Sequence, residues 1–442
     1  MTPDPIRPMQ EPEATTVAIV GAGLSGLIAA RELQRRGVDF LLLEAADRTG
    51  GRAMGETTAL GSRVDLGGQW IGHDHHRIAA LAAELGATQF RMYTRGVPIL
   101  LGNKRRVSLA APSLLPAVLA LAGVEALTRI PSRRKRDATV ASLLAKVPGA
   151  TARRLLGVLA DVSWTADLDR MTVDSMVNMI RHQGGLRTML STTGGAQDTL
   201  VTESIGSLTE HLADEVALRI RTDHRVTAIV QDDAGVTIAT TQREVRASKV
   251  IVTVPPPMAR RIRFDPPLPA ALAELQASTY MGSVFKAIAV YARPFWRERI
   301  GGEFIVVDHP GRAVFDSGAP GGPGHLVILV GGPTAQALDD LDPARRRAML
   351  LDDLVPHVGR EVLEPASWHE KSWHRDENAG GGYLALTLPG SPIELPFPHA
   401  PVGHVHWAGT ETAHDHPGYL DGAIEAGLRA AAEIGALLGA LS

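Results

Sequence analysis

One lysine interrupts an otherwise apolar stretch of the chain. Residues 282 to 296, GSVFKAIAVYARPFW, place Lys286 between Phe285 and Ala287 in a run that predicts a buried strand. An ammonium taken out of water costs several kcal/mol unless it is paired or loses its proton. Two interpretations follow: Lys286 lies on an edge strand and reaches solvent, or it is held in a buried site where it does chemistry.

A glycine-rich turn near the N-terminus suggests a second kind of chemistry. The segment TTVAIVGAGLSGLIAARELQRRGVDFLLLEA predicts a strand at 17–20, a helix at 25–36 and a second strand at 38–43 that ends in Glu44. In this pattern a first glycine permits the sharp turn, a second lets the backbone approach a pyrophosphate, and a third lets the helix pack on the strand. The helix N-terminus favours the negative charge of a phosphate.

These features predict a dinucleotide site. Gly21, Gly23 and Gly26 occupy the three glycine positions, and Glu44 is placed to accept a hydrogen bond from a ribose hydroxyl. A second glycine turn ends in Arg52, whose guanidinium suits bidentate binding of a diphosphate. The pattern by itself does not separate NAD from FAD.

The C-terminal segment belongs to the same predicted unit. An apolar strand runs into Gly409, and a helix follows Gly418. A helix N-terminus there would stabilise negative charge on a reduced flavin. Both ends of the chain would then hold one cofactor, in a discontinuous domain.

Composition limits the function classes. The 442 residues carry a formal net charge of −3, which gives no basic excess for nucleic acid. Cysteine is absent, which excludes disulfides, thiolate nucleophiles and a thioether link to a cofactor. Residues 1–13 are expected to be a disordered tail, because they are rich in proline and acid and contain no secretory signal. The basic run at 133–136 is interpreted as a solvated loop or helix end, and a cytoplasmic protein is expected.

The apolar segment 109–128 could be mistaken for a membrane span. It contains two prolines and Glu125, so we expect a buried or entrance-lining helix pair and no membrane contact. The C-terminal helix is interrupted by charged residues and is expected to be amphipathic.

Taken together, the motifs resemble those of one family. The chain from about residue 15 to its end resembles the flavin-containing monoamine oxidase family, in its soluble bacterial type, through GAGLSGL, LEAADRTGGR, DLGGQWIG, IVTVPPP, GSVFKA, WHRDENAGGGY and WAGTETAHDHPGYLDGAIEAG. The resemblance implies FAD as the cofactor, an amine as substrate and O2 as the electron acceptor.

The resemblance also assigns roles to single residues. Lys286 matches the lysine that holds a water near the flavin and assists its reoxidation. Tyr383 and Tyr419 match the two tyrosines that form an aromatic cage in front of the flavin. Leu190 and Gln197 match substrate-cavity positions. The cofactor-binding residues expected from motif and resemblance are Gly21, Gly23, Ser25, Gly26, Glu44, Arg52, Gly68, Gln69, Trp70, Val226, Trp373, Gly409, Thr410, Glu411, Tyr419 and Leu420.

Three departures from the family pattern matter. Mammalian members attach FAD through a cysteine just before the first cage tyrosine, where this chain has Gly382, so noncovalent FAD is expected. Ala46 replaces a second arginine near the adenosine phosphate, which removes one phosphate contact. The chain also ends soon after its last helix, without the membrane anchor of those members.

The expected fold is a two-domain α/β flavoprotein. The Rossmann-like FAD domain comprises 14–88, 202–276 and 376–442, and the substrate domain, of sheet plus helices, comprises 89–201 and 277–375. The expected reaction oxidises the C–N bond of a primary amine to an imine, which hydrolyses to an aldehyde or ketone, while O2 gives hydrogen peroxide.

Three alternatives stay open. An L-amino acid oxidase would need a cation such as Arg181 or Arg187 for the substrate carboxylate, and a polyamine or diamine oxidase a carboxylate such as Asp308 or Asp316. From another class, the chain could bind FAD as a structural element only.

Two histidine clusters and the assembly complete the sequence-based expectations. The clusters at 73–76 and 414–416 are interpreted as polar loops rather than a metal site, because neither has helical i,i+4 spacing. His73 or His416 could tune pH dependence near the flavin. A homodimer is one assembly that the sequence leaves open.

Overall fold

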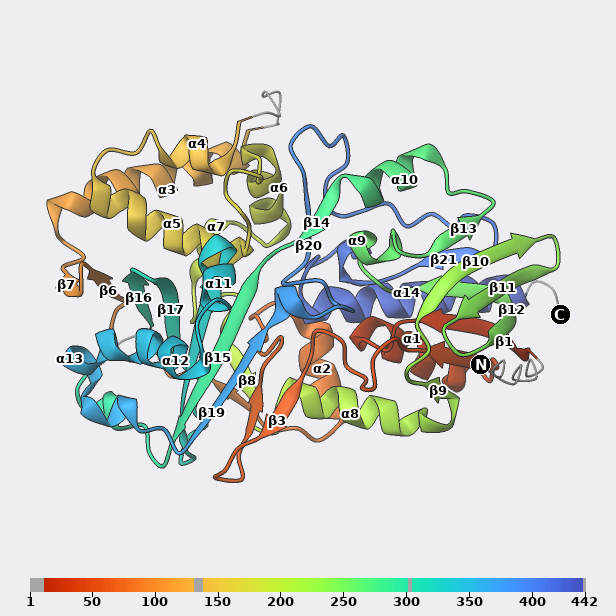
Figure 1. Cartoon of the computed structure of the whole chain (residues 1–442), viewed down its shortest axis with the longest axis horizontal. Coiled ribbons are helices and arrows are strands. Elements are labelled where there is room, and N and C mark those ends of the chain that lie inside the picture. Colours follow the sequence, from red (N-terminus) through yellow and green to blue (C-terminus); the bar gives the residue numbers. More distant parts are fainter. Residues whose placement is uncertain (1–11, 131–137, 301–303, 440–442) are drawn as a thin grey trace, which may run out of the picture.

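The computed structural model describes residues 12–130, 138–300 and 304–439. The chain forms two bodies side by side, with both termini at the right-hand end of the view in Figure 1. Most of the predicted N-terminal tail and the basic run at 133–136 lie outside the described residues. Glu13, assigned to the tail, begins the first strand.

The first body is built on an eight-stranded sheet that joins distant parts of the chain. The N-terminal strand β1 pairs in parallel with both β2 and β12, and the C-terminal strand β21 pairs with β12. Helix α1 packs against α14, so the two ends of the chain lie together (Figure 1). The strands are β1 (Glu13–Val20), β2 (Phe40–Leu43), β9 (Ile220–Arg221), β10 (Val226–Asp232), β11 (Gly235–Thr240), β12 (Glu244–Val252), β13 (Arg263–Asp265) and β21 (Val405–Trp407). The helices are α1 (Leu24–Arg35), α2 (His76–Glu84), α8 (Ile205–Glu215), α9 (Pro256–Ala259), α10 (Ala270–Ala277) and α14 (Leu420–Gly439).

The second body contains a seven-stranded, mostly antiparallel sheet in the order β19-β15-β18-β17-β16-β6-β7. Helices α3 to α7 gather on one side of it, at the upper left of Figure 1. The strands are β6 (Ile99–Gly102), β7 (Arg105–Val107), β15 (Val284–Tyr291), β16 (Ile305–Asp308), β17 (Gly311–Asp316), β18 (Gly324–Gly331) and β19 (Ser367–Ser372). The helices are α3 (Leu115–Thr128), α4 (Val140–Leu144), α5 (Ala150–Trp164), α6 (Val173–His182), α7 (Leu186–Leu190), α11 (Gly332–Leu338), α12 (Pro343–Leu351) and α13 (Val355–Val358).

Three two-stranded ribbons complete the fold. They are β3 (Gly55–Thr57) with β4 (Arg63–Asp65), β5 (Gln89–Arg91) with β8 (Thr199–Val201), and β14 (Thr279–Met281) with β20 (Ala385–Thr387). The second and third ribbons pair segments more than a hundred residues apart in the chain, at the boundary between the two predicted domains.

Strand β15 decides between the two interpretations of Lys286. The strand lies between β18 and β19, and all eight of its residues are buried. The edge-strand interpretation is therefore wrong, because Lys286 has a hydrogen-bonded neighbour strand on each side.

The apolar segment 109–128 differs from its prediction. It forms a single short 3-10 turn at Pro112–Leu114 followed by one helix, α3, instead of the expected buried or entrance-lining helix pair. Among the residues of α3 only Ala117 is fully buried, so the helix lies at the surface. No helix in the described part of the chain is long and apolar enough to cross a membrane.

Candidate active site

A cavity of about 420 Å³ lies where the two bodies meet and collects most of the predicted site residues. The predicted residues on its wall are Gly21, Gly23, Ser25, Glu44, Arg52, Gly68, Gln69, Trp70, Leu190, Gln197, Val226, Lys286, Trp373, Tyr383, Gly409, Thr410, Tyr419 and Leu420. Gly26 and Glu411 are not on the wall, and their roles in cofactor binding stay predictions.

The glycine turn leaves bare backbone at the start of α1. Gly21 has a φ of +102°, and a Cβ there would lie 2.6 Å from Oγ1 of Thr253. A Cβ on Gly26 would lie 2.0 Å from the carbonyl oxygen of Gly21, which explains why this glycine serves helix–strand packing behind the wall. No side chain caps the N-terminus of α1 at Gly23. Free N–H groups at an uncapped helix start fit a pyrophosphate.

Glu44 closes the same end of the cavity. Its side chain accepts hydrogen bonds from the backbone N–H groups of Ala22, at 2.7 Å, and Ala46, at 2.8 Å. Burial raises the pKa of this carboxyl, and the two bonds oppose that rise. Each carboxylate oxygen keeps a lone pair for a further donor, so the residue fits a ribose hydroxyl. The wall here therefore fits the adenosine diphosphate part of FAD.

Arg52 links two parts of the site. Its guanidinium donates to Glu411 Oε1 and to the carbonyl oxygen of Tyr383, both at 2.7 Å. The predicted contact of Arg52 with a diphosphate stays a prediction, and the structure adds a second task, which is to fix the Tyr383 backbone. Sequence analysis did not assign a role to Arg48, which lines the cavity and donates to the Gly51 carbonyl.

Lys286 projects from β15 into the cavity and is 3% exposed. Its ammonium donates to the Gly67 carbonyl oxygen, at 2.8 Å, and to Oε1 of Gln69, and it lies 5.5 Å from the centre of the Trp70 ring. Burial lowers the pKa of Lys286, and the charge of Asp65 opposes that shift. The amide nitrogen of Gln69 is buried without a hydrogen-bond partner among the described residues, which is a free donor at the cavity.

Asp65 is a functional residue that sequence reasoning missed. It is buried, and its two oxygens accept from the N–H groups of Ile205 and Gly206 at the start of α8, each at 2.9 Å. Burial raises the pKa of Asp65, whereas Lys286 and the two backbone bonds lower it. Its position two residues before the GGQW turn is the sequence signal that could have found it.

The two tyrosines are held by their backbones. The N–H of Tyr383 donates to Oγ1 of Thr165 at 3.1 Å, and Arg52 holds its carbonyl. The carbonyl of Tyr419 accepts from Oγ1 of Thr410 at 2.7 Å, and its N–H donates to the His416 carbonyl. Burial raises the pKa of both phenols, so both stay neutral.

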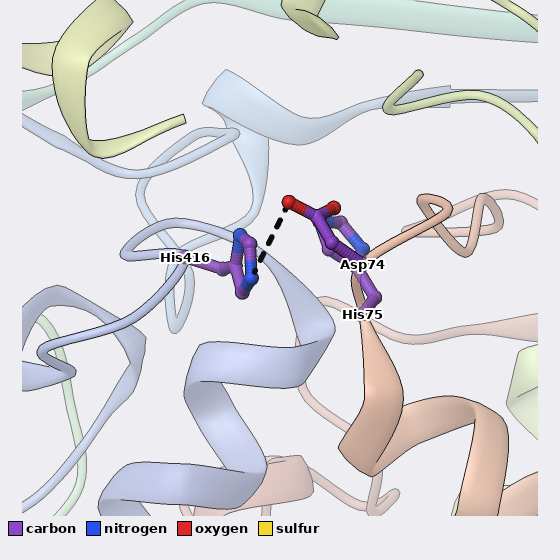
Figure 2. Close-up of side chains that lie close together, drawn as sticks. All are labelled: Asp74, His75 and His416. Atoms are coloured by element: carbon purple, nitrogen blue, oxygen red, sulfur yellow. Dashed lines mark ion pairs between the residues drawn. The ribbon is translucent and has the colours of Figure 1, made fainter. Parts of the chain in front are cut away.

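Two histidines support Tyr419. The His75 ring lies 4.7 Å from the Tyr419 ring and 4.6 Å from the His416 ring, and His416 faces Asp74 (Figure 2). His75 is 2% exposed, and burial lowers its pKa to about 4. Its Nδ1 accepts from the Gly72 N–H at 2.9 Å, so the proton of the neutral ring is on Nε2.

The position of the proton on Nε2 of His75 also affects whether this cluster could bind a metal. Asp74, His75 and His416 offer ligand atoms within 4.8 Å of one another. A metal would need the protonated Nε2 of His75, and reaching Nδ1 instead would break the bond to Gly72. This geometry favours the prediction that the cluster holds no metal.

The predicted substrate domain forms part of the cavity wall, and this part carries almost no charged side chains. Its members, taken from 89–201 and 277–375, are Val158, Leu159, Val162, Ser163, Gln183, Met189, Leu190, Ala196, Gln197, Val284, Lys286, Phe304, Val306, Ala313, Phe315, Leu329 and Trp373. We call this set the substrate wall. Lys286 is its only charged member among the described residues.

The carboxylates and cations suggested for other substrates are engaged elsewhere. Asp308 pairs with Arg154 at 2.9 Å, and Asp316 accepts from Trp296 Nε1 and Arg297. Arg181 donates to backbone carbonyls at the end of α3. None of these residues, nor Arg187, lines the cavity. The structure therefore does not bring these four residues to the cavity wall.

The fold and the glycine turn with Glu44 are typical of a flavin-dependent enzyme. Similarity to known proteins identifies its family. Residues 24–435 match the family described as flavin containing amine oxidoreductase, and the chain belongs to this family. It is 33% identical to a Mycobacterium tuberculosis protein assigned as the flavin-containing monoamine oxidase AofH, over 97% of this chain and 98% of that one. It is 31% identical to an L-amino acid dehydrogenase of Synechocystis, over 95% and 94% of the two chains.

Solved structures show the same architecture. Cyclohexylamine oxidase from Brevibacterium oxydans superposes with a TM-score of 0.90 at 28% identity, covering 96% of this chain and 99% of that one. A putrescine oxidase bound to putrescine superposes with a TM-score of 0.85 at 26% identity and the same coverage. These likenesses confirm the predicted α/β amine oxidase fold and an enzyme of the flavin amine oxidoreductase type.

Proposed function

We propose that the protein oxidises the C–N bond of an apolar primary monoamine, with FAD bound noncovalently and O2 as the electron acceptor. The observation that supports this choice is the substrate wall, where Lys286 is the only charged side chain among the described residues. A second ammonium on the substrate would be buried there without a partner, which costs several kcal/mol, and a carboxylate would meet only Lys286, whose ammonium already donates to Gly67 and Gln69. An alkyl or aryl group would gain from the same burial.

Each residue of the site has a defined task in this proposal. Bound FAD supplies the redox chemistry, taking a hydride equivalent from the carbon beside the nitrogen and passing electrons to O2 to give hydrogen peroxide. Tyr383 and Tyr419 orient the neutral amine with their ring faces. Lys286 holds a positive charge beside the site where negative charge develops. The imine product hydrolyses to an aldehyde or ketone and ammonia.

The noncovalent attachment of FAD and the cellular location of the enzyme are part of the proposal. No cysteine is present in the chain to bind FAD covalently, and Gly382 occupies the position before Tyr383. We assign the enzyme to the cytoplasm, where the chain can take up FAD as it folds. A homodimer stays a prediction.

A matched set of amines tests the substrate class. Hexylamine, 1,6-diaminohexane, 6-aminohexanoate and norleucine share an alkyl chain and differ only in charged groups. We expect peroxide release with hexylamine to exceed that with each charged analogue by at least about 100-fold in kcat/KM, since each factor of ten needs about 1.4 kcal/mol. Equal or faster turnover of a charged analogue would contradict the monoamine assignment, and retained FAD without turnover of any amine would favour a structural flavin.

A further inference from the structure

The strongest unexplained feature outside the active site is the outer face of α3. Leu115, Val118 and Leu119 are 59%, 58% and 63% exposed, and they follow the i, i+3, i+4 spacing of one helix face. Ala122 and Ala126 continue the face as exposed residues one and two turns further on. We call these five residues the α3 face. A contiguous exposed apolar face of this length marks an interaction surface.

The opposite side of the helix packs on the protein through Ala117, Leu121, Val124 and Leu127. Glu125, the only carboxylate in α3, accepts from the N–H of Leu186 at 3.2 Å and pairs with Arg129. Arg181 donates to the carbonyls of Leu127 and Thr128. Because apolar contacts hold the inner side of α3 and Arg181 holds its C-terminal end, the α3 face is presented outward on a fixed helix.

Cations flank the α3 face. Arg105 and Arg106 on β7 are exposed and form no ion pair with any described residue, and Arg129 at the C-terminal end is 76% exposed. Val107 of β7 packs against the same hydrophobic cluster that contains Leu114, the residue before α3. Lys104 pairs with Asp353 at 2.9 Å and Arg129 pairs with Glu125 at 3.3 Å. Arg105 and Arg106 therefore supply the unpaired positive charge beside the α3 face, although the whole chain has a net charge of −3.

We propose that the α3 face docks the enzyme on an anionic phospholipid bilayer, with the helix lying in the plane of the headgroups. Apolar side chains that enter the headgroup–acyl boundary and cations that meet anionic lipid are the two signals that stable interfacial binding requires. A second copy of this chain fits less well, since two such faces would bring their cations together. Helix α3 also contacts α7, whose Met189 and Leu190 line the cavity. The docked enzyme would thus hold its substrate wall close to the membrane, where apolar amines partition.

Vesicle flotation of the FAD-loaded enzyme tests this proposal. We expect binding to vesicles of equal parts phosphatidylcholine and phosphatidylglycerol, weak binding to phosphatidylcholine alone, and loss of binding at about 1 M salt, where screening shortens to about 3 Å. The triple variant L115S/V118S/L119S and the double variant R105E/R106E should each lower the partition coefficient about ten-fold or more. These are surface changes, and an unchanged visible flavin spectrum checks that each variant is folded.

Matched controls lie elsewhere on the surface. Leu218→Ser removes a leucine that is 90% exposed, and Arg246→Glu reverses an exposed cation on β12; neither should change flotation. No flotation with anionic vesicles would overturn the proposal. So would a concentration-dependent dimer in sedimentation that the triple variant dissociates, because the face would then be covered by a second copy. Peroxide release without vesicles should be the same in all variants, which separates this test from that of the proposed function.

Discussion

The two sides of the cavity recognise their ligands in different ways. On the dinucleotide side the chain offers bare backbone at Gly21 and Gly23 and a carboxylate, Glu44, held by two backbone bonds. On the substrate wall it offers apolar side chains and one buried lysine. A dinucleotide is polar and is bound by directed hydrogen bonds, whereas the substrate wall selects by excluding charge.

This difference determines which substitutions are severe. A change of backbone conformation or a new close contact at Gly21 should abolish cofactor binding, because a Cβ there would lie 2.6 Å from Oγ1 of Thr253 at a φ of +102°. A change on the substrate wall should alter which amine is oxidised while FAD stays bound.

The largest effect is expected at Gly21. In Gly21→Ala the new Cβ meets Oγ1 of Thr253 at a backbone φ that disfavours side chains, so we expect loss of FAD by more than about 100-fold in affinity. The ratio of flavin absorbance to protein absorbance in the purified variant measures this loss of FAD. Gly37→Ala is the matched control, since its φ is +71° and no atom lies within 4 Å of the new Cβ. Full FAD occupancy in Gly21→Ala would contradict the view that the dinucleotide side of the cavity depends on bare backbone.

Lys286→Met should slow flavin reoxidation by O2 by about 100-fold while changing flavin reduction by the amine much less. The reason is the loss of a fixed positive charge at the site where negative charge develops. Stopped-flow absorbance of the two half-reactions separates them. Unchanged oxygen kinetics would remove Lys286 from the reaction.

Gln197→Glu should change the substrate preference. The residue is half-buried on the substrate wall, and a carboxylate there would pair with a distant ammonium. We expect kcat/KM for 1,6-diaminohexane to rise about ten-fold relative to hexylamine. Because the change keeps the side-chain size, FAD content should stay constant. An unchanged ratio of the two kcat/KM values would show that the far end of the substrate does not lie near Gln197.

Removing His75 should have a smaller effect. His75→Ala deletes the ring that packs on Tyr419, and we expect a rise in amine KM of about three- to ten-fold, the size of an aromatic pair contribution. His75→Phe, which keeps a ring, should recover most of the loss, and His73→Ala, at an exposed neighbour, should behave like the parent. Failure of the Phe variant to recover would assign the effect to the bond with Gly72.

The smallest effect is a shift in pH dependence. Asp65 raises the pKa of Lys286, so Asp65→Asn should lower that pKa. The ammonium exists below its pKa, and the decline of reoxidation on the alkaline side should therefore begin at a lower pH. A pH profile of the reoxidation rate measures this, and a shift to higher pH would contradict the pairing of the two residues.

The same contrast explains what the sequence could predict. The dinucleotide side rests on glycines and an acid within about thirty residues, whose spacing alone implies the strand–turn–helix that places them. The charge of Lys286 was visible in the sequence, but its burial depends on β18 and β19, which follow much later in the chain. The partner of Lys286, Asp65, was missed for the same reason.

The direction and the exposure of side chains are the properties that the sequence predicted least well. Asp308 and Asp316 looked available for a substrate, yet Arg154 and Arg297 bind them on the outside of the cavity. The apolar segment 109–128 predicted a buried or entrance-lining helix pair, but one largely exposed helix forms, because an apolar helix has the same sequence pattern whether it faces a core or the surface. Both properties depend on which elements pack around a residue.

Anaerobic titration of the FAD-loaded enzyme tests the central claim most directly, because it removes O2 and peroxide chemistry from the measurement. We predict that hexylamine bleaches the visible absorbance of the oxidised flavin in a single turnover, while 1,6-diaminohexane, 6-aminohexanoate and norleucine leave it unchanged over the same time. Bleaching by a charged analogue as fast as by hexylamine, or by none of the four amines, would contradict the account of an uncharged substrate wall that selects apolar monoamines.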